Sequence, residues 1–267
     1  MFASLANGSV SPTRVIQGQA SLVERTTHEL GVDPLHDEIV VPNAFSQAIL
    51  IFRGGANGEE KPIRIIQGPK TLLGGSTDTD NVAVDPAHNE IYVTQEFSDS
   101  VLVFSREGNG DVAPIRILHG PQTNMRHPRR VSVDPVNNLM VVTTTRGLWF
   151  FNRTDNGDVA PRFTIAGPKT GTGGEDMTLA KAILYPPSRK VIFGGGARRR
   201  PGGSEGGFIG IWSYDDRGDV PPMYILKNTP ATKLGRGAGV FDINSQAKQI
   251  IVASEDRVLT YSLPEAF

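Results

Sequence analysis

The sequence predicts an all-β fold made of a unit that repeats about every 50 residues. A proline follows an Asn-Gly or Arg-Gly turn and opens a short apolar segment five times, at Pro12, Pro62, Pro114, Pro161 and Pro222. Short runs of β-branched and aromatic residues, bounded by Gly, Pro, Asn and Asp, indicate strands, and no long stretch has helical periodicity. We therefore interpret residues 1–267 as one domain of β repeats.

The clearest unit predicts four strands in order. Residues 82–84 form a short first strand, and residues 91–94 and 101–104 form the second and third. Pro114 opens the fourth strand, which we place at the outer edge because proline cannot donate to a ladder on both sides. Four-stranded antiparallel blades around an axis make a β-propeller.

The two ends of the chain carry complementary parts of a unit. Residues 13–16 match only a fourth strand, and residues 257–262 match a third strand with nothing after it. Pairing them would close a ring of five blades, whose last blade is shared by residues 1–20 and 240–267, and would cover two strand edges. The alternative is that the sequence is part of a longer array.

Composition narrows the classes of partner. The 27 Lys and Arg nearly balance the 28 Asp and Glu, which argues against nonspecific binding to duplex nucleic acid. There is no cysteine and no apolar run long enough for a membrane span. If Met1 is the native start we expect a cytoplasmic protein, whereas a periplasmic or secreted chain with its signal peptide removed would look the same.

The repeat resembles a known type. Residues 91–94 read Ile-Tyr-Val-Thr, and Val-Asp-Pro turns and Asn-Gly-Asp-Val-Ala-Pro connections recur along the chain. These motifs are similar to the NHL and YVTN type of β-propeller repeat, and the resemblance covers essentially the whole chain. It implies the fold rather than the chemistry, because related propellers include lactonases, lyases and binding platforms.

The positions just before each first strand are candidates for an axial site. They are Glu29, Asn81, Arg130, Lys181 and Val240. Calcium-dependent sugar lactonases, which the chain resembles at fold level, use Glu, Asn and Asp at comparable places, so Glu29 and Asn81 are candidate calcium ligands. Arg130 and Lys181 depart from that pattern, because two cations oppose a bound metal ion. Virginiamycin-type lyases use His and Glu with magnesium, which makes His28 and Glu29 weak catalytic candidates, although neighbours on a strand face opposite ways.

Positive charge provides a second set of candidates. Arg129, Arg130 and Lys181 could bind an anion, since a guanidinium matches carboxylate or phosphate, or they could pair internally with Glu29. The longest insertion, residues 194–207, carries Arg198, Arg199 and Arg200 in a Gly-rich context. This insertion could contact a partner, or it could be a solvated loop.

We interpret the protein first as a noncatalytic binding or assembly module that presents an axial, arginine-containing face to a protein or anionic partner, without a cofactor. The alternative is a hydrolase or lyase acting on a lactone or sugar-like substrate with an axial Ca²⁺ or Mg²⁺. A homo-oligomer is a third expectation, because open blade edges can pair.

Overall fold

The computed structural model describes residues 1–3, 6–25, 27–74, 79, 81–173, 180–195, 198–200, 203–205, 207–254 and 257–267, with backbone alone at 198–200, 203–205 and 236–237. The chain divides into two compact units: residues 1–93 with 102–115, and residues 94–101 with 116–267. Among the described residues, no helix is long and apolar enough to cross a membrane.

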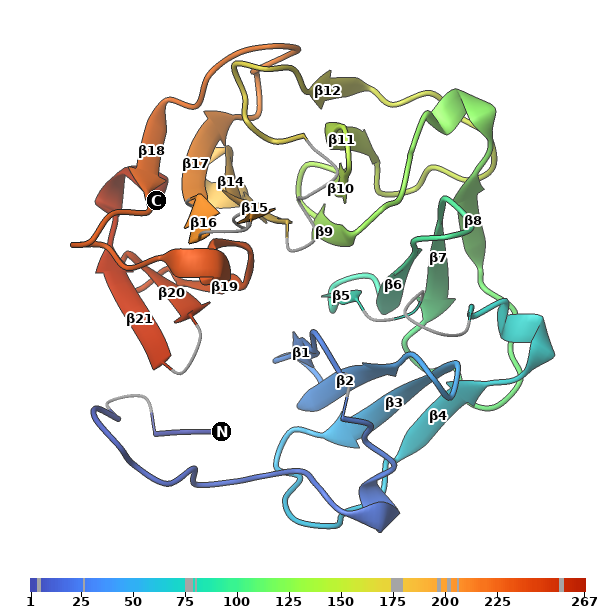
Figure 1. The fold of residues 1–267 in the computed structure, drawn as a ribbon. Coiled ribbons are helices and arrows are strands. Elements are labelled where there is room, and N and C mark those ends of the chain that lie inside the picture. The colour runs from blue at the N-terminus through green and yellow to red at the C-terminus, as the bar shows by residue number, and fades with distance from the viewer. Residues whose placement is uncertain are drawn as a thin grey trace. The chain divides into compact units, whose positions relative to one another are not determined.

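The regular structure consists of antiparallel sheets, and the fold class is a five-bladed β-propeller, as predicted (Figure 1). The first blade is β1 (Gly31–Asp33), β2 (Glu38–Asn43), β3 (Ala48–Arg53) and β4 (Arg64–Gln67). The second is β5 (Val82–Asp85), β6 (Glu90–Gln95), β7 (Ser100–Ser105) and β8 (Arg116–His119). The third is β9 (Arg130–Asp134), β10 (Leu139–Thr144), β11 (Gly147–Asn152) and β12 (Phe163–Ile165). Strand order within each sheet follows chain order.

The last two blades depart from this pattern. The fourth comprises β13 (Lys181–Tyr185), β14 (Lys190–Gly195), β17 (Phe208–Ser213) and β18 (Tyr224–Lys227). Its insertion contains a two-stranded sheet of β15 (Arg198–Arg200) and β16 (Gly203–Glu205) rather than only a loop. The fifth sheet has three strands in the described part of the chain: β19 (Phe241–Asn244), β20 (Gln249–Ser254) and β21 (Arg257–Ser262).

Short 3-10 helices punctuate the connections. They are η1 (Gln19–Ser21), η2 (Pro69–Thr71), η3 (Pro121–Thr123), η4 (Pro186–Ser188), η5 (Gly235–Gly239) and η6 (Pro264–Ala266). Each of the first three follows a glycine at positive φ, and a Cβ at Gly120 would lie 2.3 Å from Cγ of Asp158. Glycine is therefore required where the outer segment of one blade meets the next turn.

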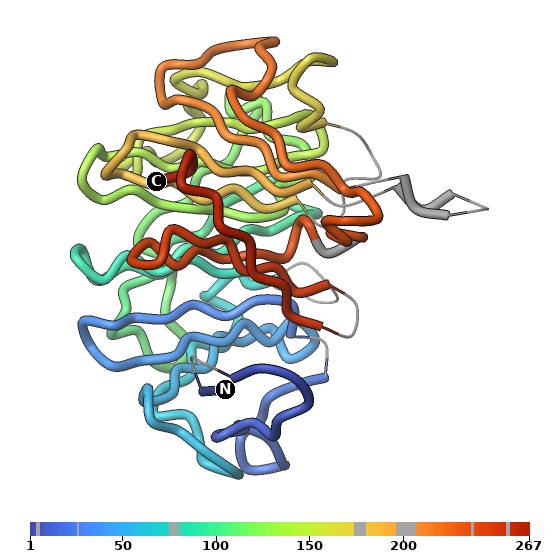
Figure 2. Tube along the Cα trace, turned by 90° about the vertical axis from the view of Figure 1, so that its left-hand side faces the viewer, coloured from blue at the N-terminus to red at the C-terminus, as the bar shows by residue number. Residues whose placement is uncertain are grey.

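Successive blades are joined by the same hydrogen bonds. Leu118 forms an isolated parallel bridge with Gly157, and the backbone N–H of Gln122 donates to Asp158 over 2.7 Å. The predicted strand at residues 13–16 takes part in a contact of this kind, since Ile16 bridges Gly58 in the first unit. Figure 2 shows this N-terminal segment in blue beside the light-blue strands of the first blade. Its pairing with residues 257–262 remains a prediction.

The core lies between neighbouring sheets. In the second unit, Val141, Leu148 and Phe150 belong to one cluster with Phe193 and Trp212, all nearly inaccessible to solvent. Trp149 and Phe151 on the opposite face are also buried. The third blade is therefore apolar on both faces.

Candidate functional site

The Val-Asp-Pro aspartates bind their own turns. Asp33 accepts the backbone N–H groups of Leu35 and His36, at 3.0 and 2.9 Å, and contacts Nδ1 of His36 at 2.8 Å. In the third blade Asn137 replaces the histidine and donates to Asp134 over 2.7 Å. Because an amide serves in place of the imidazole, we interpret His36 as a donor that stabilises its turn.

The candidate axial residues precede β1 and β5 in the first unit. His28 is exposed, Glu29 is half-buried and Asn81 is 9% exposed. The described residues contain no group of three or more His, Asp or Glu side chains arranged to hold a metal ion. The assignments of His28, Glu29 and Asn81 to catalysis or to Ca²⁺ or Mg²⁺ binding remain predictions.

The predicted cationic residues have different environments. Arg129 donates from Nη1 to Glu96 over 2.5 Å, and Arg130 is 6% exposed and donates from Nη1 to the carbonyl of Gly239 over 2.6 Å. Lys181 opens β13 and is half-buried. The backbone of Arg198, Arg199 and Arg200 forms β15, and their side chains lie outside the described part. Binding of a partner by these six residues remains a prediction.

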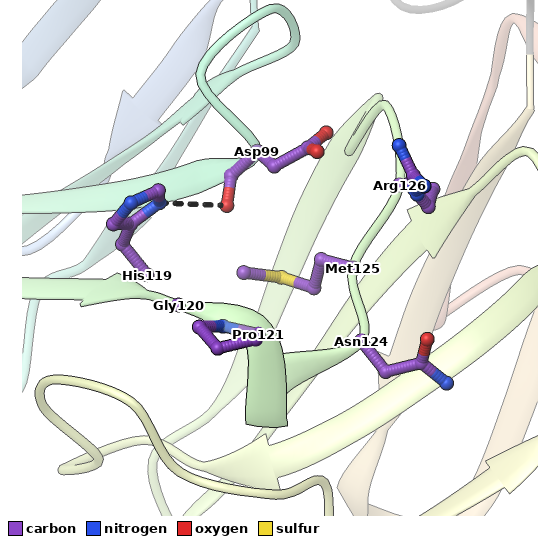
Figure 3. A pocket seen from close by; sticks show the side chains of 7 residues that line it. All are labelled: Asp99, His119, Gly120, Pro121, Asn124, Met125 and Arg126. Carbon is purple, nitrogen blue, oxygen red and sulfur yellow. Dashed lines mark hydrogen bonds between the residues drawn. The ribbon is translucent and has the colours of Figure 1, made fainter.

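A pocket of about 350 Å³ lies in the second unit, between the β6–β7 loop and the segment from β8 to β9 (Figure 3). Its lining residues are Asp99, His119, Gly120, Pro121, Asn124, Met125 and Arg126. Met125 is 3% exposed and Pro121 lies beside it, so they supply apolar surface, whereas the rim is polar. The volume falls within the range of small-ligand sites.

Hydrogen bonds hold the two segments of the pocket together. Asp99 accepts the backbone N–H of His127 at Oδ1 over 2.8 Å. The ring of Phe97 meets that of His127 edge to face, with centroids 6.4 Å apart. Together with the pair between Arg129 and Glu96, these contacts fix an aromatic side chain that is 62% exposed.

Two exposed arginines flank this structure. The backbone carbonyl of Arg126 accepts hydrogen bonds from Thr145 N and Oγ1, at 3.3 and 3.4 Å, which joins its segment to the β10–β11 turn. On that turn, Arg146 donates from Nη1 to Oδ1 of Asn124 over 3.2 Å. Within the described part of the chain, neither guanidinium has a carboxylate within 4.0 Å. We call Phe97, Arg126 and Arg146 the arginine surface.

Sequence reasoning did not assign this surface. It gave no role to Asp99, His119, Arg126 or Arg146. The available signal was a departure from the repeat. Gly18 and Gly120 both have positive φ before a 3-10 helix, and counting six residues onward gives Glu24 in the first case and Arg126 in the second.

Comparisons with known proteins support the fold. No known protein family and no curated protein matches the chain. A structure of Kuenenia stuttgartiensis hydrazine synthase is similar with a TM-score of 0.59 and 12% identity over 92% of this chain and 58% of the other. A provisionally assigned 6-phosphogluconolactonase from Bacteroides uniformis gives a TM-score of 0.55 and 15% identity over 86% and 65%. The chain thus spans less than two thirds of either neighbour, and at these identities the likeness concerns the fold alone.

Proposed function

We propose that the protein is a noncatalytic β-propeller module that binds an acidic protein partner through the arginine surface. The observation that carries the proposal is the placement of Arg126 and Arg146 on two adjoining segments, both exposed and both without a carboxylate partner in the described residues. A guanidinium forms paired hydrogen bonds with carboxylates, so this surface suits acidic side chains.

Preorganisation supports the proposal. The main chain at Arg126 is tied to Thr145, and the Arg146 guanidinium is oriented by Asn124. Fixing the Arg126 main chain and the Arg146 side chain before contact reduces the entropy lost on binding. Phe97 adds a fixed, exposed ring beside the charges, and aromatic and arginine side chains are the commonest dominant contacts in interfaces.

The insertion in the fourth blade extends the proposal. Like the β6–β7 and β10–β11 connections, the segment with Arg198, Arg199 and Arg200 joins the second and third strands of its blade sheet. We propose that these three arginines add contacts to the same acidic partner. Arg129, by contrast, would act by holding Glu96 and the loop rather than by binding the partner directly.

A labelled octaglutamate peptide tests the proposal by fluorescence anisotropy. We expect saturable binding that weakens with added salt, because exposed charges are screened. The double variant R126Q/R146Q should bind about tenfold more weakly, since two exposed charge pairs together contribute about 1 to 2 kcal/mol. R162Q is the matched control, because it removes an exposed arginine of the third blade that is not part of the arginine surface.

Two results would overturn the proposal. One is equal loss of peptide binding in R162Q and R126Q/R146Q, which would mean nonspecific attraction. The other is lactone hydrolysis that requires Ca²⁺ or Mg²⁺ and is abolished in Glu29→Ala, which would establish the alternative enzyme at the axial positions.

A further inference from the structure

The pocket beside the arginine surface contains opposite charges that do not neutralise each other. Asp99 and Arg126 both line it, yet no ion pair joins them within 4.0 Å. Oδ1 of Asp99 is used by the backbone N–H of His127, and its second oxygen has no partner in the described residues. In Figure 3 the Asp99 carboxylate and Arg126 lie on the same side of the pocket, with the Met125 side chain below them.

The other groups of the pocket divide in the same way. His119 contacts the carbonyl oxygen of Asp99 through Nδ1 at 3.5 Å, so a proton on Nδ1 leaves Nε2 as an acceptor. The Asp99 carboxylate provides acceptor oxygens, while Arg126 provides donors. Met125 and Pro121 give apolar surface between these polar groups.

We infer that this pocket binds a zwitterion of the size of an α-amino acid, with its ammonium group at the Asp99 carboxylate, its carboxylate at Arg126 and its aliphatic part on Met125 and Pro121. A ligand with both charges satisfies the two ends at once, whereas a ligand with one charge leaves the opposite group of the pocket unpaired. The volume of about 350 Å³ accommodates such a molecule.

Arg126 takes part in both the zwitterion site and the proposed partner surface, but the two need different neighbours. An acidic protein requires Arg146 and gains nothing from Asp99, whose charge opposes it. A zwitterion requires Asp99 and does not use Arg146. The two ideas can therefore fail separately.

Isothermal titration calorimetry with three related probes provides the test: leucine, N-acetyl-leucine, which lacks the positive charge, and leucinamide, which lacks the negative charge. We expect leucine to bind about tenfold more tightly than either derivative, and D99N and R126Q each to weaken leucine about tenfold. D99N is suitable because the amide oxygen can still accept the His127 N–H.

Two control variants separate the zwitterion site from the partner surface. R146Q and R162Q should leave leucine binding unchanged, and D99N should leave octaglutamate binding at least as strong as in the wild type. Binding of N-acetyl-leucine as tight as that of leucine would reduce the pocket to an anion site and overturn the inference. Unaltered leucine binding by D99N, or no leucine binding up to about 20 mM, would also overturn it.

Discussion

The β2–β3 loop of the first blade and the β6–β7 loop of the second can be compared residue by residue, because Phe45 and Phe97 occupy the same position and are 59% and 62% exposed. In the first loop, the carboxylate of Glu24 accepts the backbone N–H groups of Phe45 and Ser46 at 3.0 and 2.8 Å. The acid thus comes from the segment that precedes β1 and binds the hairpin.

In the second case the carboxylate belongs to the loop itself. Asp99 belongs to the hairpin itself and accepts the backbone N–H of His127 in the segment that precedes β9. In that segment Arg126 takes the position that Glu24 takes before β1, six residues after a glycine of positive φ. At both places a carboxylate satisfies backbone N–H groups, Glu24 those of the β2–β3 loop and Asp99 that of His127, and the second arrangement leaves the exposed Arg126 beside a pocket.

The largest loss of stability should come from removing a buried arginine, in contrast to the exposed arginines of the arginine surface. Arg106 donates to Glu38 from Nη1 over 3.0 Å and to Asn89 from Nε over 2.9 Å, and the Arg106 and Glu38 side chains are 10% and 7% exposed. Arg106→Ala should lower the free energy of unfolding by about 2–3 kcal/mol, because Glu38 and Asn89 lose a charged donor. Arg64 still pairs with Glu38 at 2.8 Å, which limits the loss.

Denaturant unfolding measures this loss, with Arg129→Ala as the comparison. The ion pair of Arg129 with Glu96 is more exposed, so its removal should cost about 1 kcal/mol or less. Equal losses of unfolding free energy in the two variants would contradict the claim that the buried contacts of Arg106 stabilise the fold more than the Arg129–Glu96 pair does.

A smaller effect is expected at the third blade, where Tyr214 donates from its hydroxyl to Asp134 over 3.0 Å. Tyr214→Phe should cost about 1–2 kcal/mol, because Asp134 loses a buried donor. Burial, and then the charge and hydrogen bond of Asp134, raise the pKa of Tyr214.

This raised pKa gives the effect of Tyr214→Phe a pH dependence. The neutral phenol is favoured in the folded state, so its contribution to stability is complete below about pH 10, the pKa of an unfolded tyrosine. It is lost progressively as the pH rises from there through the raised folded pKa. The difference in unfolding free energy between wild type and Tyr214→Phe should shrink as the pH rises from about 10 to 11. A difference that grows over this range would contradict the assignment.

Removing the Glu24 carboxylate, which binds the β2–β3 loop, should lower stability by a similar or slightly smaller amount. Glu24→Ala should cost about 1 kcal/mol, since two backbone donors lose a charged acceptor, and Glu24→Gln should recover part of it. Glu107→Ala, at a side chain that is 77% exposed, serves as the control in the same unfolding assay. A loss of stability in Glu107→Ala as large as that in Glu24→Ala would argue against a specific role for the hydrogen bonds to Glu24.

The smallest effect on stability is expected at the arginine that replaces Glu24. Arg126→Ala should change the free energy of unfolding by less than about 0.5 kcal/mol, because its guanidinium forms no hydrogen bond or ion pair within the described residues. A thermal melt of this variant beside Glu24→Ala checks the claim. A marked loss of stability would assign Arg126 to the fold rather than to binding.

Most of the blade structure could be predicted from local sequence. Short apolar runs between Gly, Pro and Asn turns predicted the strands. Closure by residues 1–20 remains a prediction, although Ile16 docks on the Gly58 turn as Leu118 docks on Gly157. The presence of charged residues before the first strands did not predict which arginine side chains already pair with other groups of the chain.

The candidate surface was harder to predict because it depends on contacts between distant segments. Arg129 and Arg126 look alike in sequence, yet only the structure shows that Glu96, 33 residues away, occupies the former. Likewise, Asp99 becomes part of a pocket only when His127 is brought to it, and the strand that carries His119 completes the wall. Side-chain pairing of this kind has no period in the sequence.

Native mass spectrometry of the protein purified from its source without chelator tests the central claim most directly, with the wild type and R126Q/R146Q measured in parallel. We expect the wild type to retain an acidic protein partner and the double variant, folded and at the same concentration, to lose it. A wild-type chain that retains no protein but carries one divalent metal ion, released by Glu29→Ala, would contradict the claim.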